Sequence, residues 1–358
     1  MLTRLRDIMD RRGENGQVPE LDGFRVVLVF LVSWYHIWQQ SWLTPHIGSL
    51  SLDFLVRAGY LPVDGTILLS GFLLFLPHAR AMLDGGPVPS VRTFYRRRLM
   101  RIVPSFYFIT LVMLFAVAIP QGSYRSAYAM WRDILTHLTF TFPFNYQTYH
   151  ATPLGGASWT LAVEVHMYLL FPLIARFARK RPAGTIGVML AVAAYFRLYI
   201  LWSTCDDLSM VLNQMISFLD VYAIGMAAAL LYVRLKQWYR QEKQKLVVFE
   251  LPATALLALC IWLFLWLMRR QAGTSGEGLE SLQAGQLIRR APLALAFAGI
   301  MVSLPFSLAP IRALFGNPVT HFLAGVSMNY YLVHQQVAVQ LKRLHIPASV
   351  SETPNVDG

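Results

Sequence analysis

Residues Leu251–Met268 read LPATALLALCIWLFLWLM, a run with no charged side chain and no polar face. At 1.5 Å per residue such a helix is about 27 Å long, close to the roughly 30 Å hydrocarbon core of a bilayer. A strand of an outer-membrane barrel would instead alternate apolar and polar residues over about 10 positions. The run therefore predicts a membrane-spanning helix and excludes a barrel.

Similar apolar runs recur along the chain of 358 residues, which is 56% hydrophobic and only 14% charged, with a mean hydropathy of +0.46. We expect an all-α, polytopic transmembrane bundle of about nine to ten spans. Nine spans can be placed, at Phe24–Leu43, Tyr60–Ala79, Ile102–Ile119, Ala157–Phe177, Gly184–Trp202, Val211–Val233, Val247–Met268, Ala291–Ala309 and Thr320–Leu341.

The basic residues between these spans predict the orientation. With the N-terminus inside, the inner segments carry 20 Lys and Arg residues and the outer segments carry nine, Arg289 and Arg290 among them. The positive-inside rule then favours a multi-pass protein of the cell (cytoplasmic) membrane with a cytoplasmic N-terminus. Basic clusters that lie between apolar spans indicate topology and do not indicate nucleic-acid binding.

The predicted organisation has three parts. Residues 1–20 form a cytoplasmic lead-in, residues 21–341 form the membrane domain, and residues 342–358 form a polar tail. Nine spans leave that tail outside, so either the count is one too low or a last span is missing. The two cysteines, Cys205 and Cys260, lie in different segments and imply neither a disulfide framework nor a cysteine metal site.

Six charged or titratable side chains fall inside the predicted spans, where each costs a few kcal/mol on insertion scales and therefore needs a partner or a function. They are Arg25, His36, Asp64, Glu164, Arg197 and Asp220. Arg25 and His36 are eleven residues apart, so they share one helix face about 16 Å apart along the axis. This pair predicts either an anion anchor with a general base deeper in the membrane, or a snorkelling arginine with a core histidine.

Two further groups leave the same choice between function and structure. Glu164 and Tyr168 lie at i and i+4 on one helix face, where the carboxylate could polarise His36 or pair with an arginine. Four arginines between Tyr95 and Pro104, including Arg98 and Arg101, could meet the phosphates of coenzyme A or serve only as a membrane anchor. Asp64, ahead of Ser70-Gly71, indicates close packing around a buried acid.

Taken together, these residues resemble the acyltransferase family 3 membrane proteins, the bacterial O-acyltransferases of surface polysaccharide, lipopolysaccharide and peptidoglycan. Five segments carry the resemblance, in the family's order. They are Leu21-Asp22-Gly23-Phe24-Arg25 with His36, Val63-Asp64 with Ser70-Gly71-Phe72, Tyr95-Arg96-Arg97-Arg98 with Arg101 and Pro104, Ser158-Trp159-Thr160-Leu161 with Glu164, Tyr168 and Pro172, and Ser327 with Tyr331-Leu332-Val333-His334.

The resemblance implies transfer of an acyl group, acetyl in the simplest case, from acyl-CoA on the cytoplasmic side to a glycan hydroxyl on the outer side. Acyl-CoA would be a substrate, and no tightly bound cofactor or metal is expected. The implied catalytic residues are His36 and Glu164, the donor-binding residues are Arg25, Arg98 and Arg101, and the supporting residues are Asp22, Asp64, Ser70, Trp159 and Tyr168.

Two alternatives stay open on the sequence. His36, Glu164 and Asp220 could form the proton relay of a transporter or flippase, although no inverted repeat is visible. The same acyl-transfer chemistry could also act on a small lipophilic acceptor.

Overall fold

The computed structural model describes residues 17–202 and 208–346 of the chain. Within these residues the protein is helical apart from one two-stranded hairpin, β1 (His46–Ile47) with β2 (Leu50–Ser51). Most of the predicted N-terminal lead-in, and the predicted tail beyond residue 346, lie outside the described residues.

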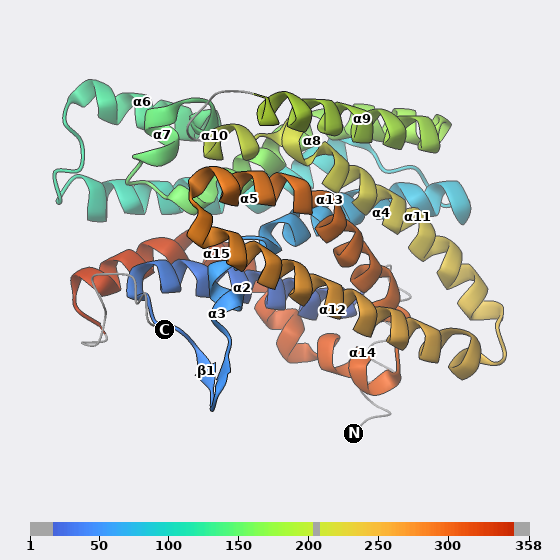
Figure 1. Cartoon of the computed structure of the whole chain (residues 1–358). Helices are drawn as coiled ribbons and strands as arrows, with labels where there is room; N and C mark the ends of the chain where they lie inside the picture. Colours follow the sequence, from blue (N-terminus) through green and yellow to red (C-terminus); the bar gives the residue numbers. More distant parts are fainter. Residues whose placement is uncertain (1–16, 203–207, 347–358) are drawn as a thin grey trace.

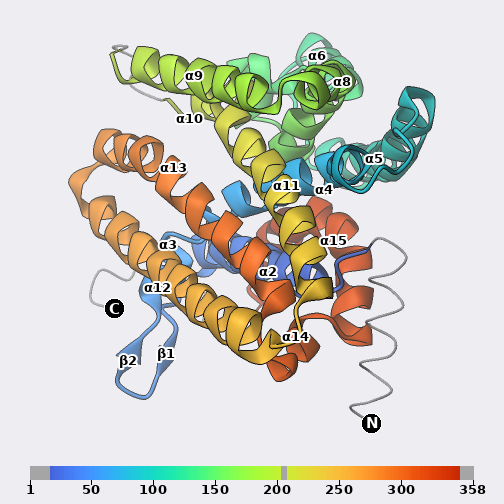
Figure 2. The ribbon, with the colours of Figure 1, turned by 90° about the vertical axis from the view of Figure 1, so that its right-hand side faces the viewer.

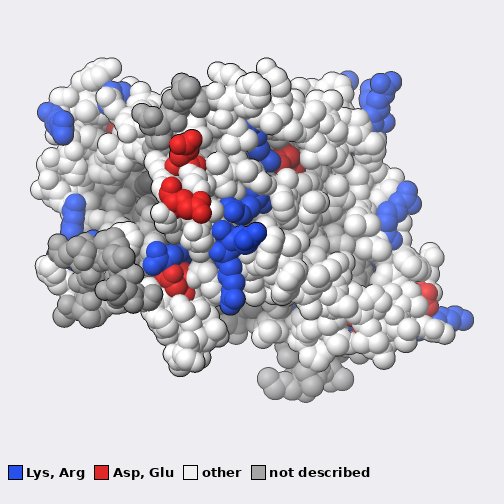
Figure 3. Space-filling model, in the orientation of Figure 1, with Lys and Arg blue, Asp and Glu red and all other residues white. Residues whose placement is uncertain are grey.

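Eight helices of the described residues are long and apolar enough to cross a membrane, as predicted for a polytopic bundle (Figure 1). They are α2 (Glu20–Ser41), α4 (Pro62–Leu83), α5 (Val91–Met113), α8 (Trp159–Lys180), α9 (Pro182–Leu201), α11 (Leu219–Gln241), α12 (Leu251–Gly273) and α13 (Leu279–Ser303). Short π or 3-10 turns extend several of them, such as η5 (Leu246–Glu250) before α12. The chain is thus a multi-pass membrane protein, and much of the face in Figure 3 is free of charge.

The ninth predicted span coincides with α15 (Pro318–Arg343), which has 26 residues but is not among the eight. This helix is long enough, but it carries more polar side chains than the others, including Asn329, Gln335, Gln336 and Gln340. It packs along α2 (Figure 2). The three glutamines are half-buried, whereas Asn329 is exposed.

The other helices are short and connect the long ones: α3 (Asp53–Arg57), α6 (Ala127–Leu138), α7 (Tyr146–His150), α10 (Ser209–Leu212) and α14 (Ala309–Phe315). α6 and α7 occupy the long connection between α5 and α8. α6 begins at Ser126, whose side chain accepts a hydrogen bond from the Ala129 N–H, a typical N-cap.

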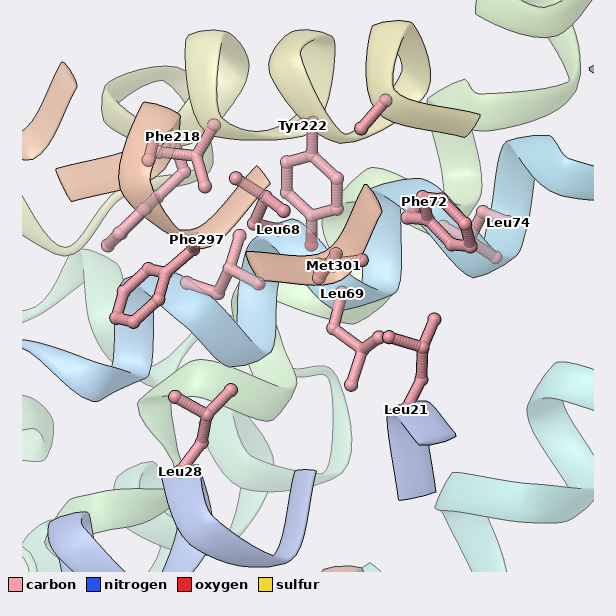
Figure 4. Packing of buried hydrophobic residues seen from close by; sticks show 14 of the residues in the cluster. Leu21, Leu28, Leu68, Leu69, Phe72, Leu74, Phe218, Tyr222, Phe297 and Met301 are labelled. Carbon is pink, nitrogen blue, oxygen red and sulfur yellow. The ribbon is translucent and has the colours of Figure 1, made fainter. Parts of the chain in front are cut away.

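α4 is the centre of the bundle and packs against α2, α11 and α13. In Figure 4, Leu68 and Phe72 of α4 lie on either side of Tyr222 of α11. Helix α11 approaches so closely that a Cβ atom at Gly225 would lie 2.5 Å from the carbonyl oxygen of Leu68. Only glycine fits there, so small residues set the spacing of these two helices.

The structure corrects two sequence boundaries. α5 begins at Val91, eleven residues before the predicted span, so the arginines from Arg92 to Arg101 lie on the helix itself. The assignment of Arg289 and Arg290 to an outer loop is wrong, because both lie within α13 and Arg290 is fully buried. Two adjacent arginines are typical of a loop between spans, but Arg290 pairs with the buried Asp64 of α4.

Candidate active site

A cavity of about 100 Å³ lies between five helices and collects most of the predicted site residues. Helices α2, α4, α5, α8 and α15 supply its lining: Arg25, Val29, Thr66, Ile67, Ser70, Leu73, Arg98, Arg101, Thr160, Leu161, Glu164, Tyr168, Ser327, Met328 and Tyr331. All three predicted donor-binding arginines are in this set, together with Glu164, Ser70 and Tyr168.

The cavity carries more positive than negative charge. Three guanidinium groups, from Arg25 on α2 and from Arg98 and Arg101 on α5, face a single carboxylate, Glu164 on α8. Arg98 and Arg101 are three residues apart, so both project from the same side of α5. Arg98 also lies over the ring of Tyr168, 5.7 Å from its centroid. Such an excess of guanidinium groups suits a phosphate-bearing ligand.

Glu164 is held by its own helix. The Tyr168 hydroxyl donates a hydrogen bond of 2.7 Å to Glu164 Oε2, which realises the predicted i, i+4 pair. The Tyr168 side chain is buried and Glu164 is half-buried. The sequence left open whether Glu164 meets His36 or an arginine, and the cavity groups it with three arginines.

His36 lies further along α2, about three turns beyond Arg25 and outside the cavity lining. Its Nδ1 lies 3.0 Å from Gln39 Oε1, and Gln39 Nε2 donates to the Tyr35 hydroxyl over 2.7 Å. Since the amide nitrogen of Gln39 is engaged with Tyr35, its oxygen faces His36. A carboxamide oxygen can only accept, so the Gln39 contact fixes the tautomer with the proton on Nδ1. Nε2 of His36 then carries the basic lone pair.

A second histidine stands beside His36. The ring of His334, on α15, has its centroid 5.0 Å from that of His36, and it also lies 5.1 Å from the ring of Tyr331, which lines the cavity. Sequence reasoning noted His334 only within a motif and gave it no role. The spacing of Ser327, Tyr331 and His334 at i, i+4 and i+7 was the available signal, because it places all three on one helix face.

The remaining predicted supporting residues have separate partners. Asp22 Oδ2 accepts a hydrogen bond of 2.8 Å from His321 Nδ1 on α15. Asp64 pairs with Arg290, and the ring of Trp159 stacks on Phe218 with centroids 5.9 Å apart. These three residues fix helices around the cavity and do not line it.

Arg197 and Asp220, the last two of the six predicted intramembrane charges, form a buried ion pair between α9 and α11. Arg197 Nη2 also donates to the Ser217 carbonyl oxygen over 3.1 Å. The pair joins two helices away from the cavity lining. Within residues 17–202 and 208–346, no group of three or more His, Cys, Asp or Glu side chains could hold a metal ion.

The structure thus combines a membrane bundle, a cationic cavity between five helices, and two histidines beside that cavity. The sequence model described as an acyltransferase domain, that of the acyltransferase 3 family, matches residues 18–351. The match covers most of the chain, which therefore belongs to this family. The predicted enzyme class is confirmed.

Three relatives of the chain are named for this activity. "Putative O-acetyltransferase SACOL0978" of Staphylococcus aureus is 22% identical over 330 residues, which cover 88% of this chain and 50% of the relative. Acyltransferase MdmB of Streptomyces mycarofaciens is 30% identical over 172 residues, 46% of this chain and 41% of the relative. O-acetyltransferase OatA of Staphylococcus aureus is 28% identical over 187 residues, 49% of this chain and 28% of the relative.

The chain thus spans half or less of the length of the curated relatives it matches. No solved structure matches it.

Proposed function

We propose that the protein transfers an acetyl group from acetyl-CoA to a hydroxyl of a glycan at the cell envelope. The observation that carries the proposal is the cavity in which Arg25, Arg98 and Arg101 face one carboxylate. The names of two relatives support O-acetyl transfer as the reaction. Membership of an acyltransferase family also disfavours the transporter alternative.

The donor would enter at the arginine-bearing part of α5. The phosphates of coenzyme A would bind Arg98 and Arg101, of which Arg101 is exposed and Arg98 half-buried. Guanidinium groups at such a boundary form charge-assisted hydrogen bonds with phosphate oxygens. The pantetheine arm would then run past Arg25 and bring the thioester carbonyl toward the histidine end of α2.

His36 would act as the general base through Nε2. The acceptor oxygen attacks the thioester carbonyl carbon as its proton moves to His36, the C–S bond breaks, and coenzyme A leaves as a thiolate that takes up the proton removed from the hydroxyl. Acid–base catalysis of this kind contributes about 10²–10⁴-fold. Holding both substrates in one site beside His36 would supply the positioning on which the base depends. A transient acyl group on His36 is the variant of this route.

Glu164 would act within the cavity by balancing the three guanidinium groups. Its contact with Tyr168 fixes the carboxylate, and Arg98 lies over the same tyrosine ring. This arrangement makes Glu164 a positioning residue for the arginines as well as a candidate partner for the imidazole. The two roles predict different effects of Glu164→Gln on donor binding.

The proposed direction places the N-terminus and the α4–α5 loop in the cytoplasm and the α5–α8 connection outside. Its basis is the excess of basic residues in the segments assigned to the cytoplasm. Single cysteines at Ser90 and Ser123, both exposed, test it in intact cells. A membrane-impermeant thiol reagent should label Ser123→Cys and spare Ser90→Cys, and the reverse pattern would overturn the orientation.

The reaction itself is tested with purified protein in nanodiscs and acetyl-CoA labelled in the acetyl group. We expect release of CoA thiol that depends on an added glycan acceptor, with the label recovered in an ester on the glycan. Release of CoA thiol that depends instead on a small lipophilic alcohol would show that the acceptor is of that class and not a glycan. No release with either acceptor, from protein that binds acetyl-CoA, would overturn the proposal.

A further inference from the structure

His334 is a buried histidine whose proton position is fixed by the backbone. Its side chain is 4% exposed, and its Nδ1 lies 2.6 Å from the carbonyl oxygen of Tyr331, one turn earlier on α15. A carbonyl oxygen can only accept, so Nδ1 carries the proton in this contact. In the neutral ring, Nε2 is then an acceptor with a free lone pair.

That second nitrogen has no hydrogen-bond partner among the described residues, although it is fully buried. Burying a polar atom without a partner costs free energy, commonly about 1–3 kcal/mol. A histidine that serves only packing usually has both nitrogens satisfied or one of them exposed. Nε2 of His137 on α6 is also buried without a partner among the described residues, so the lone pair gains its meaning from where His334 lies.

The position of His334 connects the cavity with His36. On one side its ring contacts Tyr331, a residue of the cavity lining, and on the other side it contacts the ring of His36 at 5.0 Å between centroids. Each imidazole has Nδ1 donating to a fixed oxygen, in His36 to Gln39 and in His334 to Tyr331. Both rings therefore offer Nε2 as the basic atom.

We infer that His334 is a second proton-transfer residue of the reaction, in addition to His36. His36 takes the proton of the acceptor hydroxyl as the C–O bond forms, and His334 Nε2 receives that proton from His36. His334 then delivers it to the CoA thiolate as the C–S bond breaks, so both imidazoles end neutral and the products are the ester and CoA thiol. No further reactant is required. The inference rests on the proposed function.

Two imidazoles let proton removal and proton delivery use separate groups. The hydroxyl oxygen and the thioester sulfur are both bonded to the attacked carbon, but they lie on different sides of it. An unpartnered lone pair beside His36, on the side of Tyr331, is a suitable stopping place for the proton. With two imidazoles, His36 can stay with the acceptor oxygen while His334 meets the sulfur.

The test uses His334→Gln and His334→Asn in the full chain, with His345→Gln as the matched control. Both amides can donate to the Tyr331 carbonyl oxygen, and they differ in size. At least one of the two variants is therefore expected to fit the site and fold. His345 is exposed beyond the end of α15 and belongs to no part of the site. Turnover of acetyl-CoA, KM for acetyl-CoA and thermal unfolding are measured for each protein.

We expect kcat of the folded variants to fall by about 10²-fold, with KM for acetyl-CoA within about twofold of the parent and His345→Gln at parental kcat. In His334→Ala, added imidazole should restore part of the turnover. A folded variant that keeps more than about a third of the parental kcat would overturn the inference alone. The inference would also be overturned if activity and acetyl-CoA binding fell equally and added imidazole did not restore turnover. A parent protein that binds acetyl-CoA but releases no thiol would reject the proposed function itself.

Discussion

Arg290 of α13 donates from Nε to Asp64 Oδ2 of α4 over 3.3 Å, and the two side chains are 0% and 3% exposed. Arg290 Nη1 also donates to the Ser217 hydroxyl over 2.5 Å, and its guanidinium group lies over the ring of Phe218. The pair joins three helices at the centre of the bundle without lining the cavity. Asp64, one of the six charges expected inside the membrane, is therefore explained by structure.

Removing one member of this pair should destabilise the fold more than removing both. Asp64→Ala leaves the Arg290 charge buried without its partner, for which about 3–5 kcal/mol of lost stability is expected. Thermal unfolding of Asp64→Ala, Arg290→Met and the double variant in detergent measures the coupling. The double variant should be more stable than either single variant, and a double variant with additive losses would refute the pairing.

Donor binding should depend on the arginines of the cavity and not on their neighbours. Arg98→Ala or Arg101→Ala should weaken acetyl-CoA binding about tenfold or more, because a charge-assisted phosphate contact is lost. The difference should shrink at high salt. Arg97→Ala is the control, since Arg97 is exposed on the same turn but does not line the cavity. Acetyl-CoA affinity is measured by calorimetry. Equal affinity in all three variants would mean that Arg98 and Arg101 serve only as membrane anchors.

The base is tested by His36→Gln. An amide keeps a hydrogen-bond donor for Gln39 but cannot take up a proton, so label transfer should fall by about 10²-fold or more. Acetyl-CoA binding should persist, because the arginines of the cavity are unchanged. If the folded variant transfers label at more than about a tenth of the parental rate, His36 is not the base.

Glu164→Gln and Tyr168→Phe separate two roles of the Glu164–Tyr168 contact. Glu164 is the one carboxylate among the described residues that line the cavity, so its replacement leaves three guanidinium groups unopposed. We expect donor affinity to be kept or increased while kcat falls about tenfold or more. Tyr168→Phe keeps the ring beneath Arg98 and should cost less than Glu164→Gln. Measuring kcat and KM for both variants separates an effect on turnover from an effect on donor binding. Weaker donor binding in Glu164→Gln would contradict the charge-balancing role and favour a purely structural one.

Local patterns in the sequence were sufficient for the spans and for part of the site. Uninterrupted apolar runs predicted all eight membrane helices, and the i, i+4 spacing predicted the contact of Glu164 with Tyr168. The partner of Asp64 could not be predicted, because it lies 226 residues away on another helix. His334 was passed over for a similar reason, since only the packing of α15 on α2 brings it to His36.

The contribution of α15 to the cavity has a consequence for biosynthesis. The other four walls are complete by Tyr168, whereas Ser327, Met328 and Tyr331 emerge from the ribosome more than 150 residues later. Under the proposed function, a nascent chain would hold the donor-binding arginines before it has the wall that carries His334. Truncation after Phe315 should leave a protein that binds acetyl-CoA but does not cleave it, as pulldown on CoA resin and a thiol assay would detect. If the proposed donor site is correct, late completion of this wall would keep unfinished chains from consuming acetyl-CoA.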